Sequence, residues 1–340
     1  MTLPARGRIV VLLGVLAGLA AGCQRGQPAA GPDVSSTRPV ATTAPGPQLS
    51  RFEYSKIYMG MRTRLVVYAI DETAAVNACR AAFDRVGEVD DAASDYRRDS
   101  ELMRLCATAA TRPVRLSDDL FTLLSEAQRI AELSDGAFDA TVGPYVQLWR
   151  RARKEKRLPA PEEITDAGKP VGWRKLRIDS TTRSATLAAP GMKLDLGGIA
   201  KGYAGDCAIQ TLREHGIRSA LFEAGGDIVV SDAPPGKAGW TITLVDAGPD
   251  MPQSVTVQNC GVSTSGDTQQ FVEIDGKHYS HVVDPRTGVG LTTRAMSTVI
   301  APKGIWSDGL SKPAEMLPSD KVQELLKHFP GTRAYVRVLK

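Results

Sequence analysis

Histidines, carboxylates, small residues and turn-formers gather near the C-terminal third of this 340-residue chain. Residues 263–267 read Ser-Thr-Ser-Gly-Asp, and residues 276–288 read Gly-Lys-His-Tyr-Ser-His-Val-Val-Asp-Pro-Arg-Thr-Gly. An imidazole titrates near neutral pH and can donate to a phosphate oxygen, so His281 is the candidate for proton transfer or phosphate orientation. Asp284, before Pro285, either fixes a turn or belongs to a metal shell. We expect Ser265, Gly266 and Asp267 to form a turn that faces a bound ligand.

Two further segments supply groups that suit a phosphate-containing ligand. Residues 193–203 read Lys-Leu-Asp-Leu-Gly-Gly-Ile-Ala-Lys-Gly-Tyr, at the predicted change from strand to helix. Glycines there let a ligand approach the backbone, and the N-terminus of a helix favours phosphate. Residues 135–139 read Asp-Gly-Ala-Phe-Asp. The phenylalanine ring could cover a flat heterocycle, while the carboxylate accepts hydrogen bonds from hydroxyls.

In this order the segments resemble the FAD:protein FMN transferase (ApbE) family, and the resemblance runs from about residue 54 to residue 314. It implies an α+β fold with mixed sheets and packed helices, in the T-fold-related two-part architecture of that family. It also implies Mg²⁺-dependent transfer of FMN from FAD to a Ser or Thr hydroxyl of an acceptor flavoprotein, with release of AMP. His281 or a neighbouring carboxylate such as Asp284 would assist the proton of the acceptor.

The resemblance also assigns roles to individual residues. Positions that contact the flavin cofactor are Met59, Tyr96, Ala137, Phe138, Asp139, Asp195, Lys201, Ser265, Gly266, Asp267 and His281. The metal positions are the carbonyl of Gly198 and the segment that contains Asp308, Ser311 and Lys312.

The metal segment departs from the family pattern. The family has a threonine four residues after its aspartate, whereas this chain reads Ser-Asp-Gly-Leu-Ser-Lys-Pro at 307–313. Lys312 therefore stands at a ligand position, and Pro313 is expected to disturb the helix. Three outcomes are open: Lys312 swings away and Ser311 or water completes the Mg²⁺ shell, the ammonium takes over part of the charge of the metal, or transfer is impaired. The alternatives to a transferase are a flavin-binding lipoprotein without transfer activity and an FAD pyrophosphate hydrolase.

The N-terminus predicts an exported lipoprotein. Arg6 and Arg8 precede the apolar run 9–21, which ends in Leu-Ala-Ala-Gly-Cys at 19–23. This pattern is typical of a signal peptide over 1–23 with Cys23 as the lipidated residue. An ordinary signal cut nearby and an uncleaved anchor are the alternatives. Residues 24–50 have the composition of a disordered tether, which leaves 51–340 as the ApbE-like domain facing the periplasm from a membrane.

Composition excludes one class of partner. The chain is 42% hydrophobic and 24% charged, which is ordinary for a globular protein. Its formal charge of +4 falls to +2 without the two arginines of the signal, which gives no case for nucleic-acid binding. Cys79, Cys106, Cys207 and Cys260 have no metal-ligand spacing and are expected to be small packing residues, although export leaves a disulfide open.

Periodicity predicts the elements that position these residues. Apolar spacing predicts helices over 72–90, 118–133 and 200–214, and alternation predicts strands over 64–70, 176–178, 185–187, 221–224, 227–230, 240–245 and 254–257. The basic run 150–157 is expected to be a solvated connection. Helices and strands mix without regular alternation, which favours α+β over a doubly wound sheet.

Overall fold

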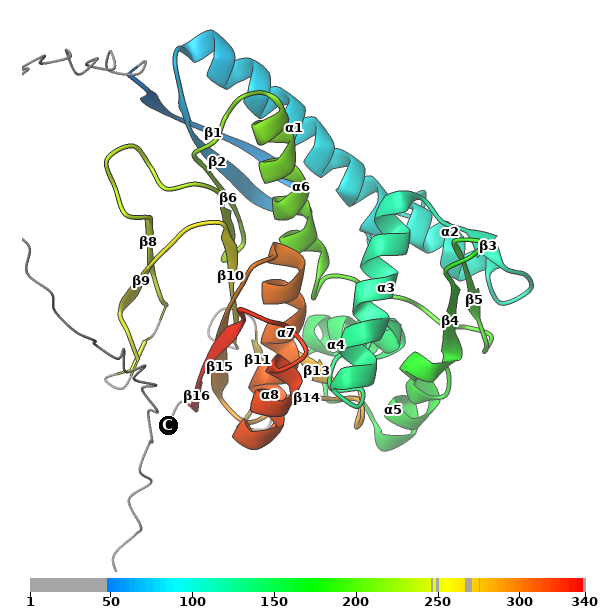
Figure 1. Ribbon diagram of the computed structural model, residues 1–340. Helices are drawn as coiled ribbons and strands as arrows, with labels where there is room; N and C mark the ends of the chain where they lie inside the picture. Colours follow the sequence, from blue (N-terminus) through cyan, green and yellow to red (C-terminus); the bar gives the residue numbers. More distant parts are fainter. Residues whose placement is uncertain (1–47, 246, 249–250, 267–270, 275, 339–340) are drawn as a thin grey trace, which may run out of the picture. The chain divides into compact units, whose positions relative to one another are not determined.

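A seven-stranded antiparallel sheet organises the larger part of the fold in this computed structural model, which describes residues 48–338 except 246, 249–250, 267–270 and 275 (Figure 1). The strand order is β1-β2-β6-β7-β10-β15-β16. The bounds are β1 Ser50–Tyr58, β2 Met61–Ala69, β6 Ala220–Ala224, β7 Asp227–Val230, β10 Cys260–Gly266, β15 Ala295–Ala301 and β16 Arg333–Val338. The order mixes early and late strands, so segments distant in sequence become neighbours.

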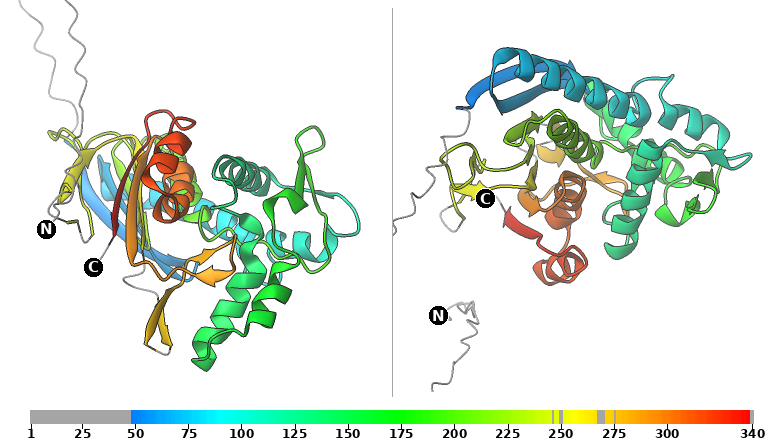
Figure 2. Two further views of the ribbon diagram at one scale, coloured as in Figure 1. Left: turned by 90° about the horizontal axis from the view of Figure 1, so that it is seen from below. Right: turned by 45° about the horizontal axis from the view of Figure 1, so that its top comes forward.

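Alternating side chains give this sheet two buried faces. On one face, Leu65 and Phe222 pack beneath helices α1 (Glu72–Ala93) and α6 (Ala200–Glu214), and α7 (Gly304–Met316) covers β10 and β15 (Figures 1 and 2). On the other face, Val66 and Leu221 pack against Trp240 of a small hairpin, β8 (Trp240–Thr243) with β9 (Ser254–Val257). The helical face carries the motifs at the starts of α6 and α7.

A second group of elements follows α1 in the sequence and is predominantly helical (Figure 2). Its helices are α2 (Glu101–Thr108), α3 (Asp118–Leu133), α4 (Gly143–Glu155) and α5 (Pro161–Gly168). The short strands β3 (Val114–Arg115), β4 (Leu176–Asp179) and β5 (Ser184–Leu187) form a sheet in the order β3-β5-β4. Its core also contains Leu310 and Ala314 of α7, so this helix joins the two groups.

Local signals explain where the main helices begin. The side chain of Asp71 accepts a hydrogen bond from the amide of Ala74 at the start of α1, and Ser117 does the same for Leu120 at the start of α3. The predicted bounds of α3 and α6 are confirmed. Helix α1 continues three residues beyond the predicted end at 90, as far as Ala93.

Small hairpins, a short helix and 3₁₀ turns complete the described part of the fold. They are the hairpins β11 (Phe271–Ile274) with β12 (Lys277–Ser280) and β13 (Val283–Asp284) with β14 (Val289–Gly290), the helix α8 (Ser319–Leu326) and the 3₁₀ turns Ala140–Val142 and Trp173–Lys175. Within the described ranges, no helix has both the length and the apolar character needed to cross a membrane.

The four described cysteines are free thiols. Cys79 and Cys106 are buried, whereas Cys207 and Cys260 are half-buried. Burial raises the pKa of Cys79 to about 12 and that of Cys260 to about 11, so both are packing residues rather than nucleophiles. Cys23 and the predicted signal and tether up to residue 47 lie outside the described residues.

Candidate functional site

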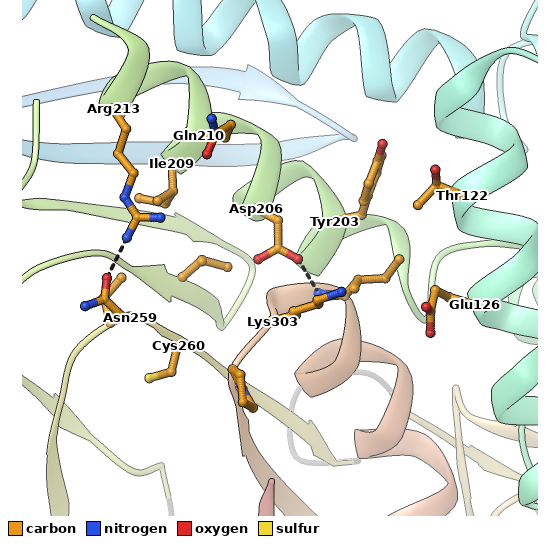
Figure 3. Close-up of a pocket in the computed structure, with 14 residues that line it drawn as sticks. Thr122, Glu126, Tyr203, Asp206, Ile209, Gln210, Arg213, Asn259, Cys260 and Lys303 are labelled. Atoms are coloured by element: carbon orange, nitrogen blue, oxygen red, sulfur yellow. Dashed lines mark hydrogen bonds between the residues drawn. The ribbon is translucent and has the colours of Figure 1, made fainter. Parts of the chain in front are cut away.

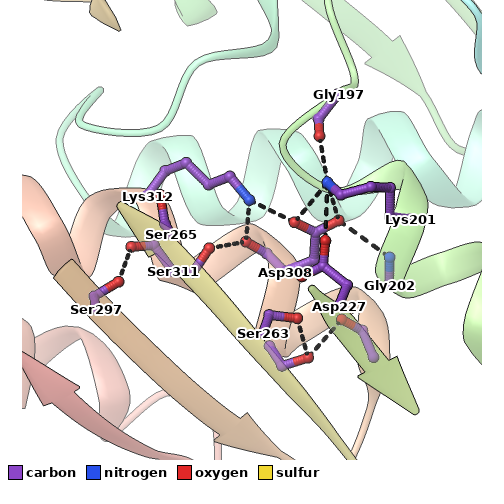
Figure 4. A network of polar contacts seen from close by, with 12 residues as sticks. Gly197, Lys201, Gly202, Asp227, Ser263, Ser265, Ser297, Asp308, Ser311 and Lys312 are labelled. Atoms are coloured by element: carbon purple, nitrogen blue, oxygen red, sulfur yellow. Dashed lines mark hydrogen bonds and ion pairs between the residues drawn. The ribbon is translucent and has the colours of Figure 1, made fainter. Parts of the chain in front are cut away.

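Two lysines and two aspartates from three elements meet between α6 and α7 (Figure 4). Lys201 Nζ, in the first turn of α6, lies 3.0 Å from Asp227 Oδ2 at the start of β7 and 3.4 Å from Asp308 Oδ2 on α7. Lys312 Nζ, one turn further along α7, lies 2.5 Å from Asp308 Oδ1. The structure therefore brings the segments around 195–203 and 307–313 together, both of which the sequence analysis assigned to the cofactor and metal site.

Burial and opposite charges compete at this cluster. Burial raises the pKa of Asp308, but Lys201 and Lys312 outweigh it and hold that pKa at about 2. Burial disfavours the charge of Lys201, yet Asp227 and Asp308 raise its pKa above the usual range. Burial, and then the charge of Asp308, raises the pKa of Asp227. Asp308 is thus held as an anion between two ammonium groups.

The two helices touch through glycine. The amide of Gly202 donates to Asp308 Oδ2 at 3.1 Å. A Cβ atom at Gly202 would lie 2.0 Å from the carbonyl oxygen of Gly304 and 2.8 Å from Cβ of Asp308. No side chain fits in this space, so the glycine at this position allows the backbone of α6 to bind the carboxylate of α7.

Gly198 joins three of the sequence segments. A Cβ atom there would lie 3.2 Å from Cε2 of Phe138 and 3.5 Å from Cε of Lys312. Phe138 is 6% exposed and packs in the core that also contains Leu196 and Ile199. The structure therefore brings Phe138, Gly198 and the aliphatic stem of Lys312 together at the border of the charged cluster. Such a border can receive a ligand that combines a flat ring with phosphate.

Lys312 lies on Asp308 in the structure and is not turned away from the site, as it would be in the first of the three open outcomes. Its ammonium group contacts both Asp308 Oδ1 and the carbonyl oxygen of Asp308, at 2.5 and 3.2 Å. Asp followed four residues later by Lys is a favourable pair on one helical face. Ser311 Oγ donates to the carbonyl of Asp308 at 2.7 Å. Pro313 was expected to disturb the helix; it lies inside α7, and the helix continues past it to Met316.

These side chains do not fit the Mg²⁺ ion that the resemblance implies. Magnesium needs oxygen ligands at about 2.0–2.1 Å in octahedral geometry. Both carboxylate oxygens of Asp308 already face ammonium groups, and the hydroxyl of Ser311 is engaged with the backbone. Among the described residues no group of three or more His, Cys, Asp or Glu side chains could hold a metal. An ion at Asp308 would have to displace Lys312 first.

The segment 263–267 borders α7. Ser265 is 6% exposed, and its hydroxyl donates to Glu315 Oε2 at 2.7 Å. Gly266 is the last residue of β10, and a Cβ atom there would lie 3.2 Å from Cγ of Met296. Asp267 lies outside the described residues. The prediction of a turn is wrong for Ser265 and Gly266, which pair with β15 as the last two residues of β10. Ser265 and Glu315 add polar groups beside the last turn of α7.

Asp195 is held by an arginine from α4. Its Oδ1 accepts from the amide of Gly197 at 2.8 Å, and its Oδ2 lies 3.5 Å from Arg150. Arg150 also bonds Asp95 Oδ2 at 2.5 Å and lies 4.1 Å above the ring of Tyr96. Burial, and then the charge of Asp95, raises the pKa of Asp195. Residues 150–155 belong to α4, so the prediction of a solvated connection over 150–157 is wrong for Arg150.

The remaining cofactor positions on this side have structural partners. Met59 lies in the turn between β1 and β2, and its amide donates to Asp90 Oδ2 at 3.0 Å. Ala137 is fully buried. Asp139 Oδ1 accepts from the amide and the hydroxyl of Thr141, both at 2.7 Å, while burial raises the pKa of Asp139. Asp139 therefore caps a turn, and Tyr96, at 76% exposed, is the accessible member of the set.

His281 and Asp284 belong to a segment that packs against α4. His281 is exposed between β12 and β13. Asp284 Oδ1 accepts from the amide of Arg286, and its carboxylate pairs with the guanidinium at 2.8 Å. Burial opposes this charge, but Arg286 lowers the pKa of Asp284. Trp149 Nε1 donates to the carbonyl of Gly288 at 2.8 Å. In the structure Asp284 fixes the turn, which was one of the two interpretations of this residue.

Sequence reasoning missed three residues of the site. Asp227 and Glu315 place carboxylates at the two ends of the polar network, and Arg150 orients Asp195. Asp227 follows Gly225 and Gly226, so a glycine turn before a strand was the available signal. Arg150 and Glu315 gave no comparable signal, because only the packing of α4 and α7 brings them to the site.

A separate cavity of about 640 Å³ lies where α3, α6 and the start of α7 meet (Figure 3). Asp206 lines it, and its carboxylate accepts from the amides of Gly304 and Ile305 at 2.7 and 2.9 Å. Burial raises the pKa of Asp206 to about 6. The cavity contains none of the residues predicted for the flavin site. Its aspartate instead holds the N-terminus of the helix that carries Asp308.

Comparison with known proteins identifies relatives across most of the chain. A profile of the ApbE family matches residues 59–336. The FAD:protein FMN transferase of Treponema pallidum (strain Nichols) is 32% identical over 302 residues, or 83% of each chain. The protein of the same name from Haemophilus influenzae is 33% identical over 242 residues, covering 68% of this chain and 70% of its relative.

Solved structures agree with this relationship. The structure is similar to the apo form of Pseudomonas stutzeri flavinyl transferase ApbE, with a TM-score of 0.75 and 29% identity. That match covers 86% of this chain and 92% of the other. The flavin transferase ApbE from Vibrio cholerae gives a TM-score of 0.73 at 27% identity, over 86% and 94% of the two chains. The predicted α+β fold is confirmed.

Proposed function

This chain belongs to the ApbE family and is a flavin transferase, and we propose that it moves FMN from FAD onto a Ser or Thr hydroxyl of an acceptor protein. The observation that carries the proposal is the meeting of Lys201, Lys312 and Gly198 beside the ring of Phe138. This arrangement offers positive charge to a pyrophosphate and an apolar surface to a ring. Both belong to the same substrate, FAD.

In the proposed reaction the acceptor oxygen attacks the phosphorus on the FMN side of the pyrophosphate. A new phosphorus–oxygen bond forms, and the bond from that phosphorus to the bridging oxygen breaks, so AMP leaves with the electron pair. Lys201 and Lys312 stabilise the negative charge on the phosphate oxygens. The proton of the hydroxyl passes to His281 or to a neighbouring carboxylate. His281 suits this role because imidazole titrates near neutral pH and the residue is exposed.

We also propose that the enzyme is an exported lipoprotein that is attached to a membrane through Cys23 and faces the periplasm. The support is the sequence alone: a basic start, an apolar run and the small residues before Cys23. The predicted tether over residues 24–50 would connect the lipid to the folded part. Its protein partner is then an exported flavoprotein.

The test is a transfer assay with the full chain, FAD and an acceptor fragment that carries the Ser or Thr flavinylation motif. Mass spectrometry should detect covalent FMN on the acceptor, and chromatography should detect AMP. An acceptor with alanine in place of the modified residue is the matched control and should remain unmodified. Asp308→Asn should lose transfer, because it releases Lys201 and Lys312 from their common partner.

The same assay separates the alternatives. Release of AMP at an undiminished rate without any acceptor would identify an FAD pyrophosphate hydrolase. Retention of intact FAD with neither AMP nor modified acceptor would identify a flavin-binding lipoprotein. Either result would refute protein flavinylation by this chain.

A further inference from the structure

We propose that the ammonium group of Lys312 replaces a divalent cation at the pyrophosphate site, so that this chain binds FAD without magnesium. The inference rests on the proposed function, because it concerns the same site and the same substrate. It assigns Lys312 the role of binding phosphate in place of a metal ion, although Lys312 stands at a metal-ligand position of the family.

The placement of Lys312 is the first support. Its ammonium group lies on Asp308 Oδ1, at 2.5 Å, and its aliphatic stem lies against Gly198. The side chain is 19% exposed, whereas Asp308 is fully buried. The lysine therefore covers the carboxylate and keeps part of its own surface available to a ligand.

The hydrogen bonds around Asp308 are the second support. Its Oδ2 accepts from the amide of Gly202 at 3.1 Å and faces Lys201 at 3.4 Å. Its Oδ1 faces both lysines, at 2.5 and 3.4 Å. Ser311 Oγ donates to the carbonyl oxygen of Asp308. A magnesium ion would have to displace these donors and then sit beside two positive charges, which is costly in a buried site.

Charge balance is the third support. The cluster contains the carboxylates of Asp227 and Asp308 and the ammonium groups of Lys201 and Lys312, so its formal charges cancel. With a neutral residue at position 312 the cluster would be anionic, and a cation would be required before it could receive a pyrophosphate. Lys312 removes that requirement because an ammonium group binds phosphate as a point charge.

The experiment measures FAD binding and metal content rather than turnover. The full chain is equilibrated with Mg²⁺, freed of unbound metal by gel filtration, and its magnesium is measured by elemental analysis. A second sample is dialysed against EDTA, and FAD is titrated into it by isothermal calorimetry with EDTA or with added Mg²⁺. The native chain should contain no stoichiometric magnesium, and its FAD dissociation constant should differ by less than about threefold between the two conditions. Lys312→Thr should bind FAD about tenfold or more weakly in EDTA, because a charged contact is lost. Added Mg²⁺ should restore that binding.

Two further variants complete the design. Lys321→Thr removes an exposed lysine of α8 and is the matched control, which should behave as the native chain. Lys312→Arg keeps the positive charge, so its FAD binding should remain independent of metal. This variant shows whether weak binding by Lys312→Thr comes from the lost charge or from a disturbed fold. Magnesium bound at one ion per chain, or loss of FAD binding by the native chain in EDTA, would overturn the inference. Metal-independent binding without transfer would refute the proposed function alone.

Discussion

Replacing Gly202 by alanine tests whether the contact between α6 and α7 builds the site. A Cβ atom at Gly202 would lie 2.0 Å from the carbonyl oxygen of Gly304 and 2.4 Å from its carbon. These are backbone atoms, so the two helices must separate. The amide of residue 202 would then lose its bond to Asp308 Oδ2, which is 3.1 Å long in the native chain.

The expected cost follows from three contributions. Overpacking of this kind costs about 1–3 kcal/mol. Loss of a hydrogen bond to a charged group costs about 1.5–3 kcal/mol. The higher helix propensity of alanine returns about 1 kcal/mol. We therefore expect the free energy of unfolding of Gly202→Ala to fall by about 3 kcal/mol, together with weaker FAD binding, because Asp308 loses one of its fixed partners.

Urea denaturation and FAD titration of the same preparations check this prediction. Gly87→Ala in α1 is the matched control, because its new Cβ would meet the Tyr58 ring, 3.1 Å away at Cε1, and that side chain can shift. We expect Gly87→Ala to change stability by less than about 1 kcal/mol. If Gly202→Ala unfolds at the same urea concentration as the native chain and binds FAD equally well, the close contact does not build the site.

Three further predictions concern charged groups. The pKa of Asp308, about 2, lies below its unfolded value, so its contribution to the free energy of unfolding should shrink by about 1 kcal/mol as the pH falls from about 5 to 3. In urea melts the unfolding free energies of the native chain and Asp308→Asn should converge over this range, and a constant difference would contradict the prediction. The pKa of Asp206, about 6, lies above its unfolded value. As the pH rises from about 4 to 7, the free energy of unfolding of the native chain should therefore fall by roughly 1–2 kcal/mol relative to that of Asp206→Asn. A difference that stays constant over this range would refute the prediction. Arg150→Met should lower the free energy of unfolding by about 1–3 kcal/mol in urea melts, because Asp195 loses its cationic partner. Arg151→Met, at an exposed arginine, is the control and should lower it by less than about 1 kcal/mol. Equal losses of stability in the two variants would contradict the prediction.

Much of the fold followed from local patterns. The helix over 200–214 and the helix over 118–133 were predicted with the observed bounds, because their apolar spacing, and the Ser117 cap of the second helix, are local properties. The strand over 227–230 was predicted for the same kind of reason. The order β1-β2-β6-β7-β10-β15-β16 was not predictable in this way, since it depends on pairing between distant segments.

The site residues can also be separated into those that local sequence patterns predict and those that only long-range packing brings together. The sequence by itself determined the family, the flavin substrate class and the segments that contain Asp195, Lys201 and Asp308, because each segment has a recognisable pattern of residues. The i,i+4 spacing of Asp308 and Lys312 is local, but only the tertiary structure decided that Lys201 and Asp227 join this pair. Ion pairs form between groups that packing brings within a few ångströms, and no local pattern specifies that distance.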